Sequence, residues 1–302
     1  MNELILDKVT IVTVTFNSSM IIRNFIESCP ESVAQIIVID NCSSDNTVEI
    51  SNNIGRKNIS VIKNHKNMGF GAACNVGFDL AETDFVLISN PDTKLSCDAI
   101  IRLIETAEAS PGAGIVAPAL YNEGRPVRSW DVDQLRRGSL QRKRTSEPWP
   151  EGPICADFVS GACMLFRRNM GFRFDGDFFL YFEDDDICAS VRNAGRYIVL
   201  DPSAKVFHAG GASSAASVQL EFFKARHMAH SRLRYIQKHA GIDSAKKQFM
   251  FYFLLSSSKM IGHFISLRFR KLNRDVAALR GSLDWFKETL TRRSRDRGSA
   301  AP

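Results

Sequence analysis

The sequence has no cysteine pair at metal-binding spacing and no apolar run long enough to cross a membrane. Its 302 residues include seven scattered cysteines without a CxxC pair, so they predict neither a zinc site nor a disulfide framework and favour a reducing compartment. The longest apolar stretch, residues 249–267, is interrupted by serine, lysine and histidine, whereas a spanning helix needs about 20 mostly apolar residues. The segment MNELILDK leans acidic and is expected to lead straight into a strand, unlike a signal peptide.

Common phosphate-binding loops are also missing. The glycines of NHKNMGFGAACNVG do not match GxGxxG, and no Walker lysine follows them, so this cluster is a weak signal taken alone. The chain contains no internal repeat. Hydrophobic residues make up 44% and charged residues 24%, an ordinary globular composition that excludes a disordered or collagen-like chain.

The net charge of +6 hides an uneven distribution. Residues 220–302 hold 18 basic and 6 acidic residues, a net of +12, which leaves 21 basic and 27 acidic residues, a net of −6, in residues 1–219. A basic end of this kind faces a polyanion such as a lipid surface or nucleic acid, but no nucleic-acid-binding motif accompanies it. Its aromatic residues are consistent with a helical hairpin packed on the rest of the chain, or with helices lying on anionic lipid. We expect a membrane surface as partner and no nucleic acid.

Apolar, β-branched runs alternate with segments of helical spacing in the first 120 residues. This alternation predicts an α/β fold with a mostly parallel central sheet flanked by helices, in which ligands bind beyond the carboxyl ends of the strands. The expected strands are 9–16, 35–40, 58–64, 84–90 and 114–121, and the expected helices are 19–29, 44–54, 71–82 and 97–110.

The second half is less regular. Residues 122–153 form a long loop rich in glycine, proline and charge, and its arginine-rich part, residues 136–144, either holds an acceptor phosphate or is simply solvated. Regular structure is expected again from residue 158. The residues beyond 217 are expected to form basic helices that end in a polar tail at 291–302. The expected elements are a strand at 158–168, a helix at 186–195 and strands at 196–201 and 204–208.

Polar residues gather where the first two expected strands end. Thr15, Asn17, Asp40 and Asp45 lie in VTFNSS and VIDNCSSDNT. An acid at the end of a second strand accepts hydrogen bonds from a nucleotide base or ribose. The alternative is that Asp40, Asn41 and Ser43 only make the turn and cap the next helix.

A carboxylate follows the fourth strand in Asn90-Pro91-Asp92-Thr93. Such a group is well placed to hold a divalent cation that bridges a diphosphate, because hard cations prefer oxygen ligands. The same four residues also favour an ordinary turn.

Four adjacent acids at 183–186 follow the aromatic stretch FDGDFFLYF. Like charges are costly to bury together unless a cation or proton chemistry requires them, and a partly buried carboxylate among acids acts as a general base. The alternative is that Asp185 or Asp186 caps the following helix. His208 lies 24 residues after Asp184 at a strand end, either as a core residue or as a nitrogen ligand of a metal.

Taken in order, these segments resemble family 2 glycosyltransferases of GT-A fold, and the Asn-Pro-Asp and FLYFED segments resemble the bacterial rhamnosyltransferase branch. The resemblance covers roughly residues 8–214 and is carried by VTFNS, VIDNCSSDNT, NMGFGAACNVG, SNPDT, SGACMLFRR, FLYFEDDDICASVRNAG and KVFHAGG. It implies a catalytic domain at 1–215, with a nucleotide-binding half at about 1–120 and an acceptor half at about 121–215. Residues 216–302 would form a basic amphipathic helical extension.

The resemblance also implies roles for the donor-side residues. It puts Thr15, Asn17 and Asp40 around the nucleotide base and ribose, and Asn67 and Gly69 near the ribose or diphosphate. These positions lie at the carboxyl ends of the first three expected strands or shortly after them.

The remaining roles concern the metal and the base. The resemblance assigns Mg²⁺ or Mn²⁺ to Asp92 and His208, and the general base to Asp184 with Glu183 beside it. Asn90 also belongs to the donor site but stands where family members carry an acid, so it brings no charge to the metal.

The implied reaction is the inverting transfer of a sugar, L-rhamnose from dTDP-rhamnose, to a lipid-linked or glycan acceptor in bacterial surface polysaccharide (O-antigen or cell-wall) synthesis. One base and one cation suit this chemistry, whereas a retaining hydrolase needs two carboxyls about 5 Å apart. The alternatives are a UDP-sugar donor (galactofuranose or N-acetylhexosamine) on the same fold, or a non-catalytic nucleotide- or lipid-binding homologue. The expected location is the cytoplasm, on the inner face of the plasma membrane.

Overall fold

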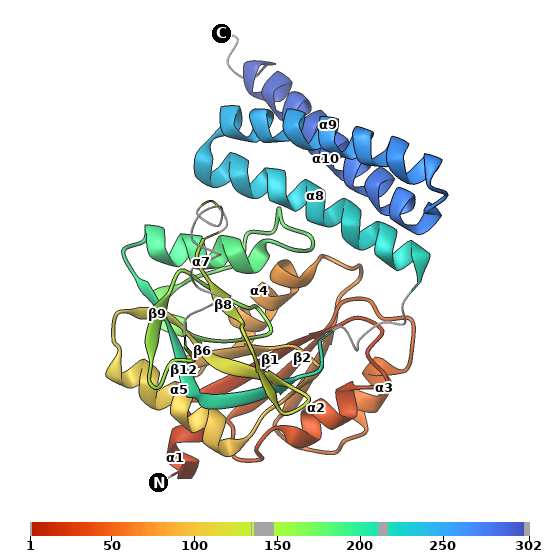
Figure 1. The fold of residues 1–302 in the computed structure, drawn as a ribbon. Helices are drawn as coiled ribbons and strands as arrows, with labels where there is room; N and C mark the ends of the chain where they lie inside the picture. The colour runs from red at the N-terminus through yellow and green to blue at the C-terminus, as the bar shows by residue number, and fades with distance from the viewer. Residues whose placement is uncertain (1, 134, 136–147, 211–216, 299–302) are drawn as a thin grey trace. The chain divides into compact units, whose positions relative to one another are not determined.

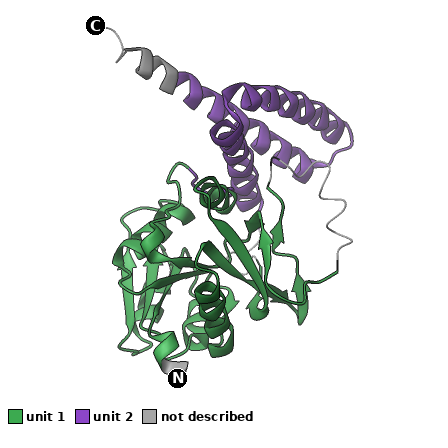
Figure 2. Cartoon of the chain, turned by 90° about the vertical axis from the view of Figure 1, so that its left-hand side faces the viewer, with its two compact units in different colours: residues 1–177, 183–215 green, residues 178–182, 216–302 purple. Residues whose placement is uncertain are grey.

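The computed structural model describes residues 2–133, 135, 148–210 and 217–298 (Figure 1). The chain forms two compact units (Figure 2). The first, called here the sheet unit, holds residues 1–177 and 183–215, and the second, the helical unit, holds residues 178–182 and 216–302. The short segment 178–182 therefore belongs to the helical unit, although its neighbours in sequence on both sides belong to the sheet unit.

A ten-stranded sheet forms the centre of the sheet unit. Its strand order is β3-β2-β1-β4-β11-β6-β12-β5, with β7 on β6 and β9 on β12, and β8 and β10 form a separate pair. The strands are β1 (Val9–Thr15), β2 (Gln35–Asp40), β3 (Ile59–Lys63), β4 (Phe85–Ser89), β5 (Thr93–Lys94), β6 (Ala113–Asn122), β7 (Arg125–Val127), β8 (Trp130–Asp131), β9 (Ile154–Ala156), β10 (Phe158–Val159), β11 (Cys163–Arg167) and β12 (Tyr197–His208).

The predicted α/β architecture is confirmed, with a sheet that is parallel in one part and mixed in the other. Strands β3, β2, β1 and β4 are all parallel. Beyond them β11 runs antiparallel to both β4 and β6, while β6 and β12 are parallel. The sheet is mixed here because the long excursion after β6 brings the chain back in the opposite direction as β11.

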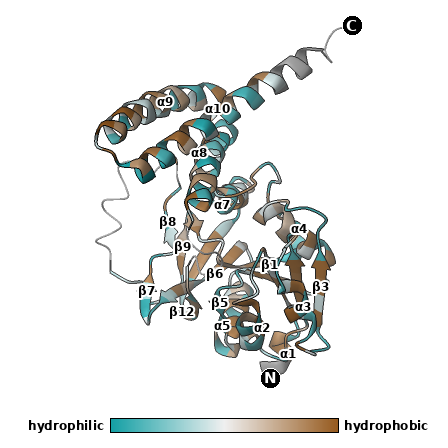
Figure 3. Cartoon of the chain, turned by 90° about the vertical axis from the view of Figure 1, so that its right-hand side faces the viewer, coloured by the Kyte–Doolittle hydropathy of each residue, from teal (hydrophilic) through white to brown (hydrophobic). Residues whose placement is uncertain are grey.

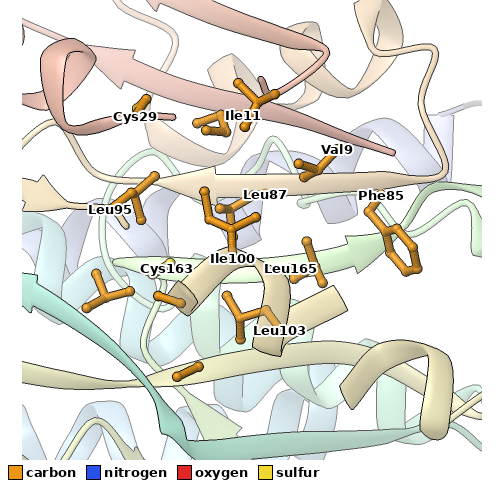
Figure 4. Packing of buried hydrophobic residues seen from close by; sticks show 14 of the residues in the cluster. Val9, Ile11, Cys29, Phe85, Leu87, Leu95, Ile100, Leu103, Cys163 and Leu165 are labelled. Carbon is orange, nitrogen blue, oxygen red and sulfur yellow. The ribbon is translucent and has the colours of Figure 1, made fainter. Parts of the chain in front are cut away.

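Helices cover both faces of this sheet, which explains why its strands are apolar along their whole length. One buried cluster joins the strands to α1 (Asn2–Leu6), α2 (Ile22–Ser28) and α5 (Cys97–Ala109). The other joins them to α4 (Phe70–Leu80) and α7 (Glu183–Asn193). A further helix, α3 (Thr47–Asn52), follows β2. Figure 4 shows the first cluster, which includes Ile11, Leu87, Leu103 and Leu165.

The helical unit consists of three long helices and the segment 178–182. The helices are α8 (Val218–Ala240), α9 (Ile242–Ile265) and α10 (Phe269–Gly298). Their small core holds Leu233, Phe249 and Trp285, and the Trp285 indole donates to Gln237 at 2.8 Å. Within the described part of the chain, no helix is both long and apolar enough to span a bilayer.

Several boundaries differ from the sequence-based expectations. The start of the chain is the helix α1 and not a lead into a strand, and helix α10 extends to Gly298 into the expected polar tail. The expected strand 158–168 is split into β10 and β11 by a loop at 160–162, called here the Gly161 loop. The two strands expected at 196–208 are one strand, β12, with register shifts that accommodate Pro202. The arginine-rich residues 136–144 lie outside the described residues.

Candidate functional site

The ends of β1 and β2 are joined by a buried carboxylate. Thr15 and Asp40 are neighbours in the parallel ladder, and the Thr15 hydroxyl donates to Asp40 Oδ1 at 3.1 Å. The backbone N–H of Ser43 donates to Asp40 Oδ2 at 2.9 Å. Asp40 is fully buried, so its carboxylate organises the loop that follows β2.

The loop after β1 is held against the loop after β2. Asn17 is exposed and adopts a left-handed φ of 52°, a conformation that asparagine tolerates better than most residues. Its backbone N–H donates to Ser43 Oγ at 2.8 Å, and its side-chain oxygen accepts from the Ser44 N–H at 2.9 Å. Burial acts to raise the pKa of Asp45, but hydrogen bonds from Thr47 and Ser19 outweigh it and lower that pKa.

Asn41 connects the loop after β2 to the loop after β3. Its amide nitrogen donates to Asn67 Oδ1 at 2.8 Å and to the Gly69 carbonyl at 3.1 Å, and its oxygen accepts from the Met68 N–H at 3.0 Å. Gly69 has a φ of 85° and precedes α4, a conformation that favours glycine. From the sequence, Asn41 was expected only to help make the turn after the second strand, and its contacts with the loop after β3 were not predicted.

Asp92 and His208 meet at the far edge of the sheet. His208 pairs with Thr93 where β12 and β5 run antiparallel, and His208 Nε2 lies 3.3 Å from Asp92 Oδ1. The Asp92 side chain is 6% exposed and that of His208 is 22% exposed. Among the described residues, no group of three His, Cys, Asp or Glu side chains converges as a metal site, so this pair provides an incomplete ligand set.

The Gly161 loop links this edge to the four adjacent acids at 183–186, called here the acid run. Asn90 donates its backbone N–H to the Ala162 carbonyl at 2.9 Å, and the Gly161 N–H donates to Asp184 Oδ2 at 3.2 Å. A Cβ atom on Gly161 would lie 3.2 Å from the Asp184 Cβ, so a side chain there would crowd the carboxylate. From the sequence, Gly161 belongs to SGACMLFRR, one of the segments that carry the resemblance, but no role was predicted for it.

The acid run forms the first turn of α7, whereas the sequence predicted that it would precede the helix. The positive end of the helix dipole stabilises acids at this position. Burial, reinforced by the charge of Asp184, raises the pKa of Glu183 to about 8. Glu183 Oε2 is buried and makes no hydrogen bond. Tyr181 and Phe182, directly before the run, both have a left-handed φ, of 67° and 66°, which costs about 1–3 kcal/mol per non-glycine residue.

The raised pKa of Glu183 predicts a stability that depends on pH. Between pH 4.5, the ordinary pKa, and pH 8 the unfolded chain loses a proton that the folded chain keeps, so the free energy of unfolding falls as pH rises. Glu183→Gln removes this pH-dependent loss of stability. The Tm of the variant minus the Tm of wild type should therefore increase by roughly 5 °C from pH 4.5 to pH 8. Exposed Glu105→Gln is the control in thermal melts across this range, and parallel curves for wild type and Glu183→Gln would contradict the prediction.

The structure thus brings the proposed site residues into two groups. Thr15, Asn17 and Asp40 are connected through Ser43, and Asn67 and Gly69 are joined to them through Asn41. Asn90, Asp92 and His208 form the second group, and the Gly161 loop connects it to Asp184 and Glu183.

With this geometry the chain can be compared with known proteins. The model of Glycosyl transferase family 2 matches residues 10–171. The chain therefore belongs to this family and is a glycosyltransferase.

Individual relatives are more distant. The chain is 26% identical over 236 residues to N-acetylglucosaminyl-diphospho-decaprenol L-rhamnosyltransferase of Mycobacterium tuberculosis, covering 67% of this chain and 76% of the relative. It is 32% identical over 146 residues to succinoglycan biosynthesis protein ExoO of Rhizobium meliloti, covering 45% and 42%. Its resemblance to the rhamnosyltransferase branch agrees with the first of these matches.

Solved structures share the fold. GalNAc-T7 with UDP, GalNAc and Mn²⁺ gives a TM-score of 0.56 at 15% identity, covering 80% of this chain and only 54% of that one. The mannosyltransferase PcManGT from Pyrobaculum calidifontis with GDP-Man and Mn²⁺ gives 0.54 at 13% identity, covering 92% and 87%. At these identities the likeness concerns the GT-A fold alone.

Proposed function

We propose that this glycosyltransferase moves a sugar from a nucleotide diphosphate to an acceptor hydroxyl with inversion, and that Asp184 is its general base. The observation that carries the proposal is the Gly161 loop, which connects Asp184 to the edge where Asp92 and His208 meet. One base and one cation-binding pair are what a single displacement requires.

The donor lies over the carboxyl ends of the parallel strands in this proposal. Exposed Asn17 faces the nucleotide, while Thr15 and Asp40 hold the loops that shape this end of the site. Asn67 and Gly69 lie at the start of α4, whose unpaired N–H groups favour an anion such as the diphosphate. We accordingly assign residues 1–120 to the donor and residues 121–215 to the acceptor.

The Asp92–His208 pair fits a divalent cation. Ligands of an octahedral Mg²⁺ lie at about 2.0–2.1 Å, so adjacent ligands are about 3 Å apart, close to the 3.3 Å between Asp92 Oδ1 and His208 Nε2. The neutral Asn90 adds no charge, so the remaining ligands of a bound cation would have to come from the donor phosphates and water. When bound, Mg²⁺ or Mn²⁺ neutralises the charge that develops on the departing diphosphate.

The chemical step follows from this arrangement. Asp184 accepts the proton of the acceptor hydroxyl as that oxygen attacks the anomeric carbon. The bond between the anomeric carbon and the diphosphate oxygen breaks with its electron pair, and the nucleoside diphosphate leaves. The Gly161 N–H fixes one Asp184 oxygen, and neutral Glu183 keeps further negative charge away from the base.

We further propose L-rhamnose from dTDP-rhamnose as the donor sugar and a lipid-linked acceptor in bacterial surface polysaccharide synthesis. Support comes from the name of the mycobacterial relative at 26% identity and from the succinoglycan relative. Calorimetry with dTDP-rhamnose, UDP-galactose, UDP-N-acetylglucosamine and GDP-mannose in Mg²⁺ tests this choice. Preferred binding of dTDP-rhamnose supports it, preference for a UDP-sugar replaces the sugar but keeps the reaction, and no binding at all overturns the proposed function.

The helical unit has a face suited to the membrane that carries such an acceptor. The outer side of α9 presents a stripe of exposed apolar residues with helical spacing. They are Met250, Phe251, Leu254, Ile261 and Ile265, and the apolar residues of α9 are brown in Figure 3. Residues 246–271 contain six Lys and Arg and no acid, so cations accompany the apolar stripe. We propose that this face lies on anionic lipid at the inner surface of the plasma membrane.

Leu254→Ser should weaken binding to vesicles of phosphatidylglycerol and phosphatidylcholine by roughly 10-fold, because a buried leucine contributes about 1.5–3 kcal/mol. The matched control is Leu290→Ser on α10, which removes another leucine of similar exposure, 53% against 63%. Co-sedimentation in low and high salt measures the effect. Equal binding by both variants would contradict the proposed face.

A further inference from the structure

One face of α8 contacts the segment 178–182, which directly precedes the acid run. The contacting residues recur every three or four positions and therefore lie on a single side of the helix. They are Phe223, His227, Ser231, Tyr235 and Lys238. Five contacts from one helix face reach four of the five residues of this segment, Phe178, Phe179, Leu180 and Phe182, and indicate a docking surface for it.

Aromatic contacts hold both ends of the segment. The Phe179 ring lies 6.0 Å from that of Phe223 and 4.9 Å from that of His227. The Phe182 ring lies 5.6 Å from that of Tyr235, and both of these residues are buried.

A hydrogen bond holds the middle of the segment. Ser231 Oγ donates to the Leu180 carbonyl at 2.9 Å, and Ser231 is 1% exposed. Serines within helices commonly donate to a carbonyl of their own helix, as Ser282 does to Ala278 at 3.0 Å. Ser231 instead satisfies a backbone group 51 residues earlier in the chain.

The contacts with α8 surround a strained part of the backbone. Tyr181 and Phe182 are both left-handed, and such a conformation in non-glycine residues persists only where the surroundings fix it. Asp184 follows Phe182 by two residues, so this segment leads directly into the first turn of α7.

We infer that α8 positions the general base: Ser231 and the aromatic residues on its face hold residues 178–182 in the conformation that sets Asp184 in place. This inference rests on the proposed function, in which Asp184 is the base. Ser231 is a positioning residue, since it acts through the segment and not on the substrate. By this inference the helical unit contributes to the chemical step through residues 178–182.

The test compares Ser231→Ala with Ser282→Ala, two buried helix serines of the same unit that differ in the carbonyl they bind. Ser231→Ala should lower kcat about 10-fold while the Kd for the nucleoside diphosphate stays within about twofold, because misplacement of a catalytic group lowers the rate of the step without affecting donor binding. Ser231→Thr, which keeps the hydroxyl, should recover most of the loss. Ser282→Ala should leave both values near wild type.

Hydrogen exchange at the amides of residues 180–184 separates this inference from the proposed function. Exchange should be faster in Ser231→Ala than in Ser282→Ala, and Phe179→Leu, a second variant of the same contact surface, should show the same increase and the same lower kcat. Equal exchange and equal kcat in the two serine variants would overturn the inference. If wild type transfers no sugar, the proposed function fails, and the exchange comparison alone still decides whether α8 holds the segment.

Discussion

Asp184→Asn is expected to lower kcat by about 10²–10⁴-fold, the usual contribution of a general base. The amide keeps the size of the carboxylate and an oxygen that can accept from the Gly161 N–H, so the start of α7 should keep its structure. What is lost is the ability to take the proton of the acceptor hydroxyl. The Kd for the donor should therefore stay near the wild-type value.

The control for this variant is Asp177→Asn, the same change at an exposed acid seven residues earlier. Its kcat should match wild type. Turnover by Asp184→Asn within a few-fold of wild type would remove Asp184 from the role of base and move attention to its neighbours in the acid run.

Asp92→Ala should make donor binding insensitive to the cation and lower kcat/KM by roughly 10²-fold or more, because the diphosphate loses the charge that neutralises it as it leaves. His208 alone then provides one ligand, which is too few to hold Mg²⁺. Calorimetry with and without EDTA measures the change. In wild type EDTA should weaken binding, and in Asp92→Ala it should have little effect.

Asp98→Ala is the matched control, since Asp98 is an exposed acid six residues further along the chain and pairs with Arg102. It should keep the EDTA response of wild type. An Asp92→Ala variant with the same EDTA response as wild type would place the cation elsewhere or exclude its role in donor binding.

The alternating patterns predicted most of the sheet unit because its strands are covered on both faces. Runs such as QIIVID are apolar along their whole length, and this feature can be seen in the sequence itself. The carboxyl ends of these strands also located Asp40 and Asp92, since the edge at which parallel strands end follows from their direction. The antiparallel direction of β11 depends on the path of the chain after β6, which local patterns do not encode.

The surroundings of the acid run were harder to predict. Gly161 contacts Asp184 from 23 positions away, and Ser231 contacts Leu180 from 51 positions away, distances at which residue spacing carries no signal. Tyr181 and Phe182 have a backbone conformation usually associated with glycine or asparagine, so their residue types gave no sign of it. Tertiary packing against α8 overrides the local preference there.

The anomeric configuration of the product tests the central claim most directly. The wild-type chain, incubated with the proposed donor dTDP-rhamnose, Mg²⁺ and a lipid-linked acceptor, should yield a product whose rhamnosyl linkage, read by NMR, is inverted relative to the donor. Inversion is expected because the proposed mechanism is a single displacement with Asp184 as its one base. A product that retains the donor configuration would require a second step and would contradict the mechanism proposed for this site.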